Sequence, residues 1–262
     1  MNETIQSISN HVVILGWSER VKRIVAELRN EVHRASGDIR PILIISESQD
    51  AEIGSAYERV YFMHGRANDV NVLARANLAA AHSLLIPATM PEAEASDGHS
   101  VFSLLAALSV HPNLRVCLEV SRSENGTALA HIRRNNLSAG DIEIVSFESV
   151  AERLLAQASV SSGVTRVYEH LLSFATDSNE IYVCEASAPW QGKSFRELSA
   201  VCFEREVIVL GYEHEGELIL NPKDREYTFA PGDKVWFLAY SRAAGLSVID
   251  PELLKRVKAK EQ

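Results

Sequence analysis

The sequence predicts an α/β protein with a doubly wound parallel sheet, followed by a helical crossover and a small β-rich α+β lobe. Its 262 residues suffice for one large domain or two moderate ones, each with its own core. The first observation is a series of short, continuous apolar runs, at residues 12–15, 41–45, 60–63, 83–86, 115–120 and 142–147. Runs without polar alternation are typical of parallel strands that are covered on both faces.

Helix-like segments between these runs are the second observation. Apolar residues recur three and four positions apart at 18–33, 69–79, 99–110 and, more weakly, 125–137. This alternation predicts a Rossmann-like sheet with helices on both faces. Because right-handed crossovers carry all the strands in one direction, their carboxyl ends meet at one edge, where a ligand is expected to bind.

A change of pattern after about residue 147 is the third observation. Residues 148–159 and 164–175 have the apolar spacing of two amphipathic helices, and 161–163 (Ser-Ser-Gly) separates them. The neighbouring sequence offers too few partners to bury both apolar faces within one chain. We therefore expect residues 148–176 to form a helix–turn–helix dimerisation crossover that packs against a second subunit.

The remaining sequence predicts the β-rich lobe. A strand at 181–184 is followed by a short helix, and residues 207–212 pair with 217–220 through a turn at Gly216. A Pro-Gly-Asp turn then leads into a strand at 234–238. The expected domains are residues 1–147, 148–176 and 177–262.

Composition narrows the class of protein. A net charge of −9 argues against sequence-independent binding to the phosphates of nucleic acid. Residues 1–10 lack the features of a secretory signal, and no apolar run approaches the roughly 20 residues that span a bilayer. Cys117, Cys184 and Cys202 lie far apart without a C-x-x-C pair. We expect reduced, packed thiols in a cytoplasmic protein without direct membrane insertion.

The turn after the first strand is a candidate phosphate site. The strand runs into Gly16 and a helical segment follows at once, as in dinucleotide-binding sheets. The G-x-G-x-x-G fingerprint is incomplete, because Ser18 and Val21 stand where the second and third glycines belong. Backbone N–H groups from Trp17 to Glu19 and the Ser18 hydroxyl could hold a phosphate. Alternatively, Ser18 caps the helix and Glu19 complements the helix dipole.

Two later strand ends add candidates at the same edge. Glu47 follows the second strand, 31 residues after Gly16, and is either a ribose ligand or an exposed loop acid. Gly65 and Arg66 follow the third strand. Arg66 can hold a phosphate bidentately, or it can pair with Glu47 or Asp69.

With these residues in view, the sequence resembles the regulators of K+ conductance (RCK domains, also called KTN or TrkA-type) over nearly all of residues 11–240. The markers are HVVILGWSE at 11–19, FMHG at 62–65 and LILNPKD at 218–224, which runs on to FAPGD at 229–233. The Gly-Trp-Ser-Glu turn is most similar to calcium-gated prokaryotic potassium channels. The segment ASDGHS at 95–100 is similar to the Castor-type channels of plants.

The resemblance implies both an assembly and a function. In that family a Rossmann-like lobe, a crossover and a small C-terminal lobe form an intertwined homodimer, and four dimers make an octameric ring under a pore. The implied function is a cytosolic, ligand-sensing gating-ring domain that controls a potassium channel or transporter. Its partner would be a membrane-embedded potassium pore at the inner face of the membrane. An adenine nucleotide or NAD(H) is the favoured ligand, and a divalent cation is the second.

The resemblance also directs attention to Ca2+. Calcium-gated relatives carry an acid at the end of the fourth strand and two acids at the end of the fifth. The corresponding positions here are Pro87, Glu119 and Ser121. Calcium needs several hard oxygen ligands, and with one carboxylate of three this site looks degraded.

No catalytic constellation is expected. Glu92, Glu94 and Asp97 form an acidic loop that either recruits a cation by another geometry or is simply solvated. The nine histidines show no zinc spacing, and the sequence has neither a nucleophile elbow nor a P-loop. The alternative function is that of a soluble nucleotide-binding protein, or of an NAD(P)-dependent oxidoreductase, unrelated to ion transport. An oxidoreductase would need acid–base residues that the small lobe does not offer.

Overall fold

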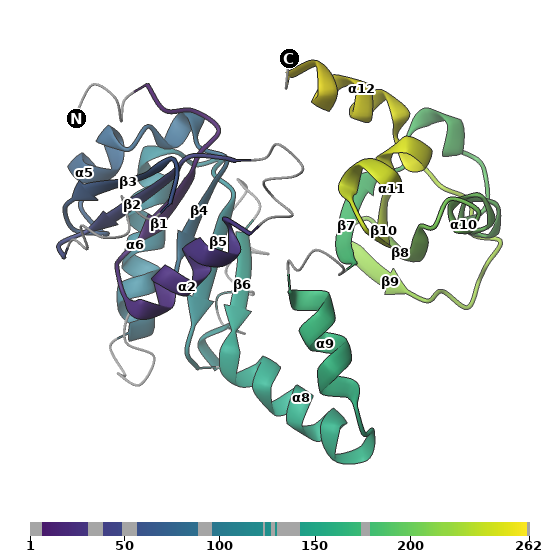
Figure 1. Cartoon of the computed structure of the whole chain (residues 1–262), viewed down its shortest axis with the longest axis horizontal. Coiled ribbons are helices and arrows are strands. Elements are labelled where there is room, and N and C mark those ends of the chain that lie inside the picture. The colour runs from purple at the N-terminus through teal and green to yellow at the C-terminus, as the bar shows by residue number, and fades with distance from the viewer. Residues whose placement is uncertain are drawn as a thin grey trace. The chain divides into compact units, whose positions relative to one another are not determined.

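The computed structural model describes residues 7–30, 39–48, 57–88, 96–122, 124–126, 129, 142–173 and 179–260. They belong to two compact units, Met1–Val164 and Thr165–Gln262 (Figure 1). The first unit contains a parallel sheet and the second an antiparallel one. In this part of the chain no helix has both the length and the apolar character needed to cross a membrane.

The first unit follows the expected alternation of strands and helices. Its elements, with η for a 3₁₀ helix, are β1 (Val12–Leu15), α2 (Glu19–Glu27), β2 (Ile42–Ser46), β3 (Val60–His64), α5 (Val70–Arg75), η1 (Leu78–Ala80), β4 (Ser83–Ile86), α6 (Ser96–Val110), β5 (Val116–Val120), β6 (Ile142–Ser146) and α8 (Phe147–Val160). The six strands are parallel and lie in the order β3-β2-β1-β4-β5-β6. The predicted doubly wound α/β fold is confirmed.

Both faces of this sheet are covered, which explains why the strand sequences lack polar alternation. Leu15 of β1 belongs to the cluster that contains Leu73 of α5 and Leu104 of α6. Ile14, the preceding residue, packs instead with Val25 of α2. These five side chains are at most 3% exposed, so neighbouring residues of one strand bury themselves in opposite layers.

The first helix is shorter than the 18–33 that the apolar spacing predicts. It ends at Glu27, and residues 31–38 lie outside the described part of the chain. Just beyond the helix, the buried Arg29 guanidinium donates to the main-chain oxygen of Arg40 at 2.6 Å. A charge-assisted bond from the buried guanidinium to this carbonyl fixes the point at which the chain leaves the helix. Most of the helix expected at 125–137 likewise lies outside the described residues.

Two amphipathic helices separate the sheets in sequence, as predicted. They are α8 and α9 (Val164–Leu172), with a turn at 161–163 between them. Neither helix has a buried residue. Their large apolar side chains that stand exposed are Phe147, Val150, Leu155, Val160, Val167, Tyr168 and Leu172. The described part of the chain therefore leaves the apolar faces of both helices uncovered.

The second unit is built on a four-stranded antiparallel sheet of order β7-β10-β8-β9. Its elements after α9 are β7 (Glu180–Glu185), η2 (Ala188–Trp190), α10 (Phe195–Phe203), β8 (Ile208–His214), β9 (Glu217–Leu220), β10 (Lys234–Ala239), α11 (Arg242–Ile249) and α12 (Pro251–Lys260). The predicted hairpin of β8 and β9 is confirmed. Glu215 and Gly216 form its turn with φ of 50° and 82°, the left-handed values that match strand twist in a two-residue loop.

Two glycines in this unit permit close approaches that a side chain would prevent. A Cβ built on Gly211 of β8 would lie 2.1 Å from the main-chain oxygen of Ile219 on the neighbouring strand. A Cβ on Gly245 of α11 would lie 1.9 Å from Cε2 of Phe237, a fully buried ring. These contacts fix how tightly β9 and α11 pack.

Candidate ligand site at the carboxyl edge of the parallel sheet

The strand order puts the topological switch point between β1 and β4, where doubly wound sheets bind ligands at the carboxyl ends of the strands. The chain leaves β1 through Gly16, whose φ of 93° is left-handed. The Gly16 N–H donates to Ile45 O at 2.8 Å. These features turn the backbone sharply from β1 into α2.

Ser18 is the N-cap of α2. Its hydroxyl accepts the Val21 N–H at 3.3 Å, so the capping interpretation describes this side chain as it stands in the structure. The main-chain N–H groups of Glu19 and Arg20 have no acceptor within the described residues. Two donors of the first helical turn therefore remain available to an anion.

Trp17 packs against the sheet. Its ring lies edge-on to Phe62 of β3, with centroids 5.4 Å apart and an interplanar angle of 76°. Both rings border the cluster on the α2 side of the sheet. Nothing in the local sequence identified Phe62 as the partner, because the contact joins the turn after β1 to the middle of β3, a strand that is not adjacent to β1 in the sheet.

Glu47 and Arg66 are brought together by the structure. Arg66 Nε donates to Glu47 Oε1 at 3.0 Å, and the two side chains are 73% and 65% exposed. Glu47 and Asp69 were the two acids expected as partners of Arg66, and the structure pairs Arg66 with Glu47. Asp69 instead caps α5 by accepting the Asn71 N–H at 2.8 Å. Water screens an exposed pair of this kind, so a phosphate can compete for Arg66 at little cost.

Gly65 is required by packing. A Cβ at this position would come within 2.7 Å of both methyl carbons of Val72 on α5. Glycine therefore lets the chain pass from β3 into α5 close to the sheet. Gly65 lies at the expected edge, and its structural contribution there is the close approach of backbone to helix.

Glu119 is held by partners within the protein. It is 7% exposed, its Oε1 lies 2.5 Å from Nη1 of Arg20, and its Oε2 accepts the Ala88 N–H at 3.0 Å. Sequence reasoning did not foresee that Arg20 pairs with Glu119. Arg20 stands on α2 and Glu119 on β5, so no motif spacing relates them. At the position considered for a metal, a guanidinium neutralises the carboxylate.

Asp97 likewise has main-chain and side-chain donors around it. It is 5% exposed and accepts the Ser121 N–H at 2.7 Å, the Arg122 N–H at 3.2 Å and Asn125 Nδ2 at 2.6 Å. Burial opposes its ionisation, but these hydrogen bonds outweigh burial and lower the pKa of Asp97. The carboxylate therefore organises the loop after β5.

Within the described residues, no three His, Cys, Asp or Glu side chains gather as metal ligands would. Glu92 and Glu94 lie outside those residues, so the acidic loop is represented by Asp97 alone. Pro87 brings no side-chain oxygen to the end of β4, and Ser121 meets Asp97 through its backbone. A cation at this edge would have to displace Arg20 from Glu119.

The three cysteines are free thiols. Burial raises the pKa of Cys117, and it raises the pKa of both Cys184 and Cys202 to about 12. Thiols with such pKa values stay protonated near neutral pH and are poor nucleophiles. Their environment fits the packing role that the sequence suggested.

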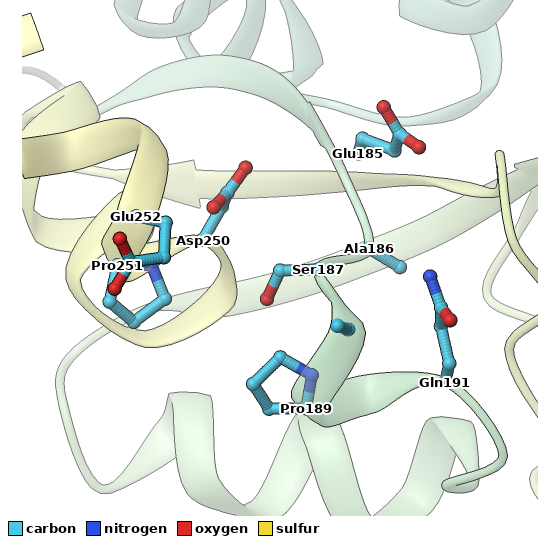
Figure 2. Close-up of a pocket in the computed structure, with 9 residues that line it drawn as sticks. Glu185, Ala186, Ser187, Pro189, Gln191, Asp250, Pro251 and Glu252 are labelled. Carbon is cyan, nitrogen blue, oxygen red and sulfur yellow. The ribbon is translucent and has the colours of Figure 1, made fainter. Parts of the chain in front are cut away.

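The second unit contains a cavity of about 360 Å³ (Figure 2). Its lining residues are Glu185, Ala186, Ser187, Ala188, Pro189, Gln191, Asp250, Pro251 and Glu252. Asp250 Oδ1 accepts the Leu253 N–H at 3.0 Å, and the Ser187 hydroxyl donates to Ile249 O at 2.5 Å. These polar groups hold the junction of α11 and α12 together.

Known proteins match both halves of the chain. Residues 7–118 match the family model described as the calcium-activated potassium channel slowpoke-like RCK domain. Residues 148–254 match the model described as Castor and Pollux, part of voltage-gated ion channel. The two matches follow one another along the chain, one beginning near β1 and the other at α8.

Individual relatives agree with these matches. The calcium-gated potassium channel TvoK of Thermoplasma volcanium is 25% identical over 244 residues, which are 90% of this chain and 64% of that protein. The ion channel POLLUX of Lotus japonicus is 25% identical over 259 residues, 94% of this chain and 27% of that protein. The chain thus spans less than two thirds of these relatives.

A solved structure shares the fold. The human SLO3 gating ring superposes with a TM-score of 0.69 at 20% identity, covering 91% of this chain and 46% of that one. At this identity the similarity speaks for the fold alone. The two family matches and the relatives show that the chain is similar to slowpoke-like RCK domains over residues 7–118 and to Castor and Pollux ion channels over residues 148–254.

Proposed function

We propose that this chain is a cytosolic, ligand-sensing regulatory domain that controls a potassium channel or transporter. Two observations together carry the proposal. A channel family matches each of two consecutive parts of the chain, and the helices α8 and α9 leave their apolar faces uncovered. A domain that transmits a conformational change needs such a surface for its partner. In this role the chain makes and breaks no covalent bond.

The proposed partner at α8 and α9 is a second copy of the chain. Side chains such as Leu155, Val160 and Leu172 are 71%, 84% and 74% exposed, which is costly for isolated helices in water. Covering them in a homodimer removes this cost. As the resemblance to RCK domains implies, dimers would assemble into an octameric ring beneath a membrane-embedded potassium pore, at the inner face of the membrane.

The proposed ligand is an adenine nucleotide or NAD(H) at the carboxyl edge of the parallel sheet. Gly16, Trp17, Ser18 and Glu19 form the turn above the switch point, and the free N–H groups of the first helical turn suit a phosphate. Glu47, Gly65 and Arg66 lie at the neighbouring strand ends, where a ribose and a second phosphate would reach. Ca2+ is the competing candidate, through Glu119.

Ligand binding can influence the pore only if the affinity for the ligand differs between two arrangements of the dimer. The ligand must bind one arrangement of the dimer more tightly than another, because equal binding to both shifts no population. A tenfold preference is about 1.4 kcal/mol per site. Several sites in one ring add their contributions.

The test combines light scattering after size exclusion with calorimetry on the purified full chain. We expect a dimer or larger assembly at micromolar concentration, and a dissociation constant below about 1 mM, roughly −4 kcal/mol, for at least one of ATP, ADP, NAD and NADH. A strict monomer with and without these ligands would contradict the assembly. Binding of Ca2+ with no nucleotide binding would overturn the nucleotide assignment.

Arg66→Met and the matched Arg75→Met examine the site itself. Arg66 lies at the proposed edge, whereas Arg75 is in the last turn of α5. We expect Arg66→Met to weaken nucleotide binding several-fold and Arg75→Met to leave it unchanged. Equal affinities for both variants would remove Arg66 from the site.

A further inference from the structure

One guanidinium joins three elements of the first unit. Arg20 is the second residue of α2, and its Nη1 lies 2.5 Å from Oε1 of Glu119 on β5. Its Cζ lies 5.9 Å from the centre of the Phe147 ring, the first residue of α8. This distance is within the range of a cation–π contact, about 6 Å. A single side chain therefore connects the turn above the switch point with the start of the crossover.

The strand register explains how Arg20 reaches both partners. β5 and β6 are neighbours, with Glu119 opposite Val145, so Phe147 stands just beyond the end of the strand beside Glu119. Glu119 is also fixed from the other side by the Ala88 N–H. The Phe147 ring is 64% exposed. The contact with Arg20 thus holds an otherwise exposed residue at the edge of the sheet.

We propose that Arg20 is a ligand-sensitive latch on α8. In the arrangement that the structure shows, it holds Phe147, and hence the start of α8, against the sheet edge through its anchor on Glu119. A phosphate-bearing ligand at the first turn of α2 draws the guanidinium toward itself and releases Phe147. The contact between Arg20 and Phe147 is seen in the structure, and its release by ligand rests on the nucleotide site proposed above.

The chemistry of the groups favours this exchange. The N–H groups of Glu19 and Arg20 would place a phosphate within reach of the Arg20 side chain. A planar guanidinium binds phosphate through two parallel hydrogen bonds, a stronger contact than one with an exposed aromatic ring. Because a guanidinium has five N–H donors, Arg20 can turn its Nε and Nη2 toward a phosphate while Nη1 stays on Glu119, which also keeps the Ala88 N–H as a partner.

Hydrogen exchange in the unliganded full chain tests the latch. We expect Arg20→Met and Phe147→Leu each to speed amide exchange at residues 149–153 by about two- to fivefold, the loss of one half-exposed cation–π contact. The double variant should exchange no faster than the single ones, since both remove the same contact. Arg23→Met is the matched control, because Arg23 is exposed on the same helix and loses the same charge.

The ligand arm uses ATP as the probe, with Phe147→Leu as the reference state. Saturating ATP should raise exchange at residues 149–153 in the wild-type chain to the level of Phe147→Leu, and it should leave that variant unchanged. Oligomeric state is monitored in every sample, because assembly through α8 would also alter exchange.

The outcomes separate the two proposals. If Arg20→Met and Phe147→Leu both exchange like the wild type, the latch is wrong whatever ATP does. If the variants accelerate exchange while bound ATP leaves the wild type unchanged or slower, release by ligand is wrong. If ATP does not bind but ADP, NAD or NADH does, that nucleotide replaces ATP as the probe. If none of the four binds, the nucleotide site and the release both fail, and the variants alone establish or reject the contact between Arg20 and Phe147.

Discussion

In the second unit, Nδ1 of His214 lies 2.7 Å from Oδ1 of Asp233. The other oxygen of this carboxylate accepts the Tyr227 hydroxyl at 2.6 Å and the Ala230 N–H at 2.8 Å. Asp233 is 2% exposed and precedes β10, whereas His214 ends β8. The cluster therefore ties the β8–β9 hairpin to the loop that leads into β10.

This cluster predicts a pH dependence of stability. The hydrogen bond to Asp233 raises the pKa of His214 against the opposing effect of burial. The folded state therefore binds the proton more tightly than the unfolded state, whose pKa is about 6.5. The stabilisation is complete below that value and is lost as pH rises through the folded pKa. Urea unfolding between about pH 6 and 9 measures it.

His214→Gln is the reference for that measurement. Burial lowers the pKa of His11, so protonation of His11 acts in the opposite direction, destabilising the fold as pH falls. The difference between the wild type and His214→Gln removes this contribution. The wild type should lose stability relative to the variant as pH rises, and parallel curves would contradict the prediction.

Removing the Tyr227 hydroxyl should weaken the same cluster. Tyr227→Phe deletes the donor to Asp233 but keeps the ring, which stacks on Tyr212 with centroids 4.0 Å apart. We expect a loss of about 1–2 kcal/mol of unfolding free energy, since the acceptor is a buried charge and the donor is only partly buried. Tyr240→Phe is the control, because Tyr240 is 60% exposed. A smaller effect for Tyr227→Phe than for the control would refute the assignment.

The packing of α11 predicts a large difference between two identical substitutions. Gly245→Ala would place a methyl group 1.9 Å from Cε2 of the buried Phe237 ring. We expect a cost of about 1–3 kcal/mol from overpacking. Gly98→Ala, in α6 with open space around it, should instead stabilise by about 0.5–1 kcal/mol through helix propensity. Thermal or urea unfolding of both variants decides the matter.

Two ion pairs of the first unit should differ in strength according to burial. A double-mutant cycle with Arg20→Met and Glu119→Gln should give a coupling of about 1–2 kcal/mol, because Glu119 is almost fully buried. The same cycle on Arg66 and Glu47, which are 73% and 65% exposed, should give about 0–1 kcal/mol. Added salt should weaken only the second pair appreciably. Equal couplings would show that burial does not set their strength.

Much of the fold was predictable because it depends on short-range patterns. Continuous apolar runs such as 41–45 reflect burial on two faces, and a strand carries that signal in its own residues. The hairpin at Glu215 and Gly216 was readable from the turn, as was the strand-to-helix turn at Gly16. The sequence overestimated the first helix, because the contact of Arg29 with Arg40 lies outside any local pattern.

The candidate site, like the fold, was predictable only where it depends on short-range patterns. By itself, the sequence determined the parallel sheet whose strand ends place Gly16, Glu47 and Gly65 at one edge, since chain direction and crossover handedness suffice for that. Only the tertiary structure decided that Arg66 pairs with Glu47 and that Arg20 pairs with Glu119. The reason is physical: pairing between side chains on different elements depends on distances and rotamers across the sheet, and no spacing along the chain records them.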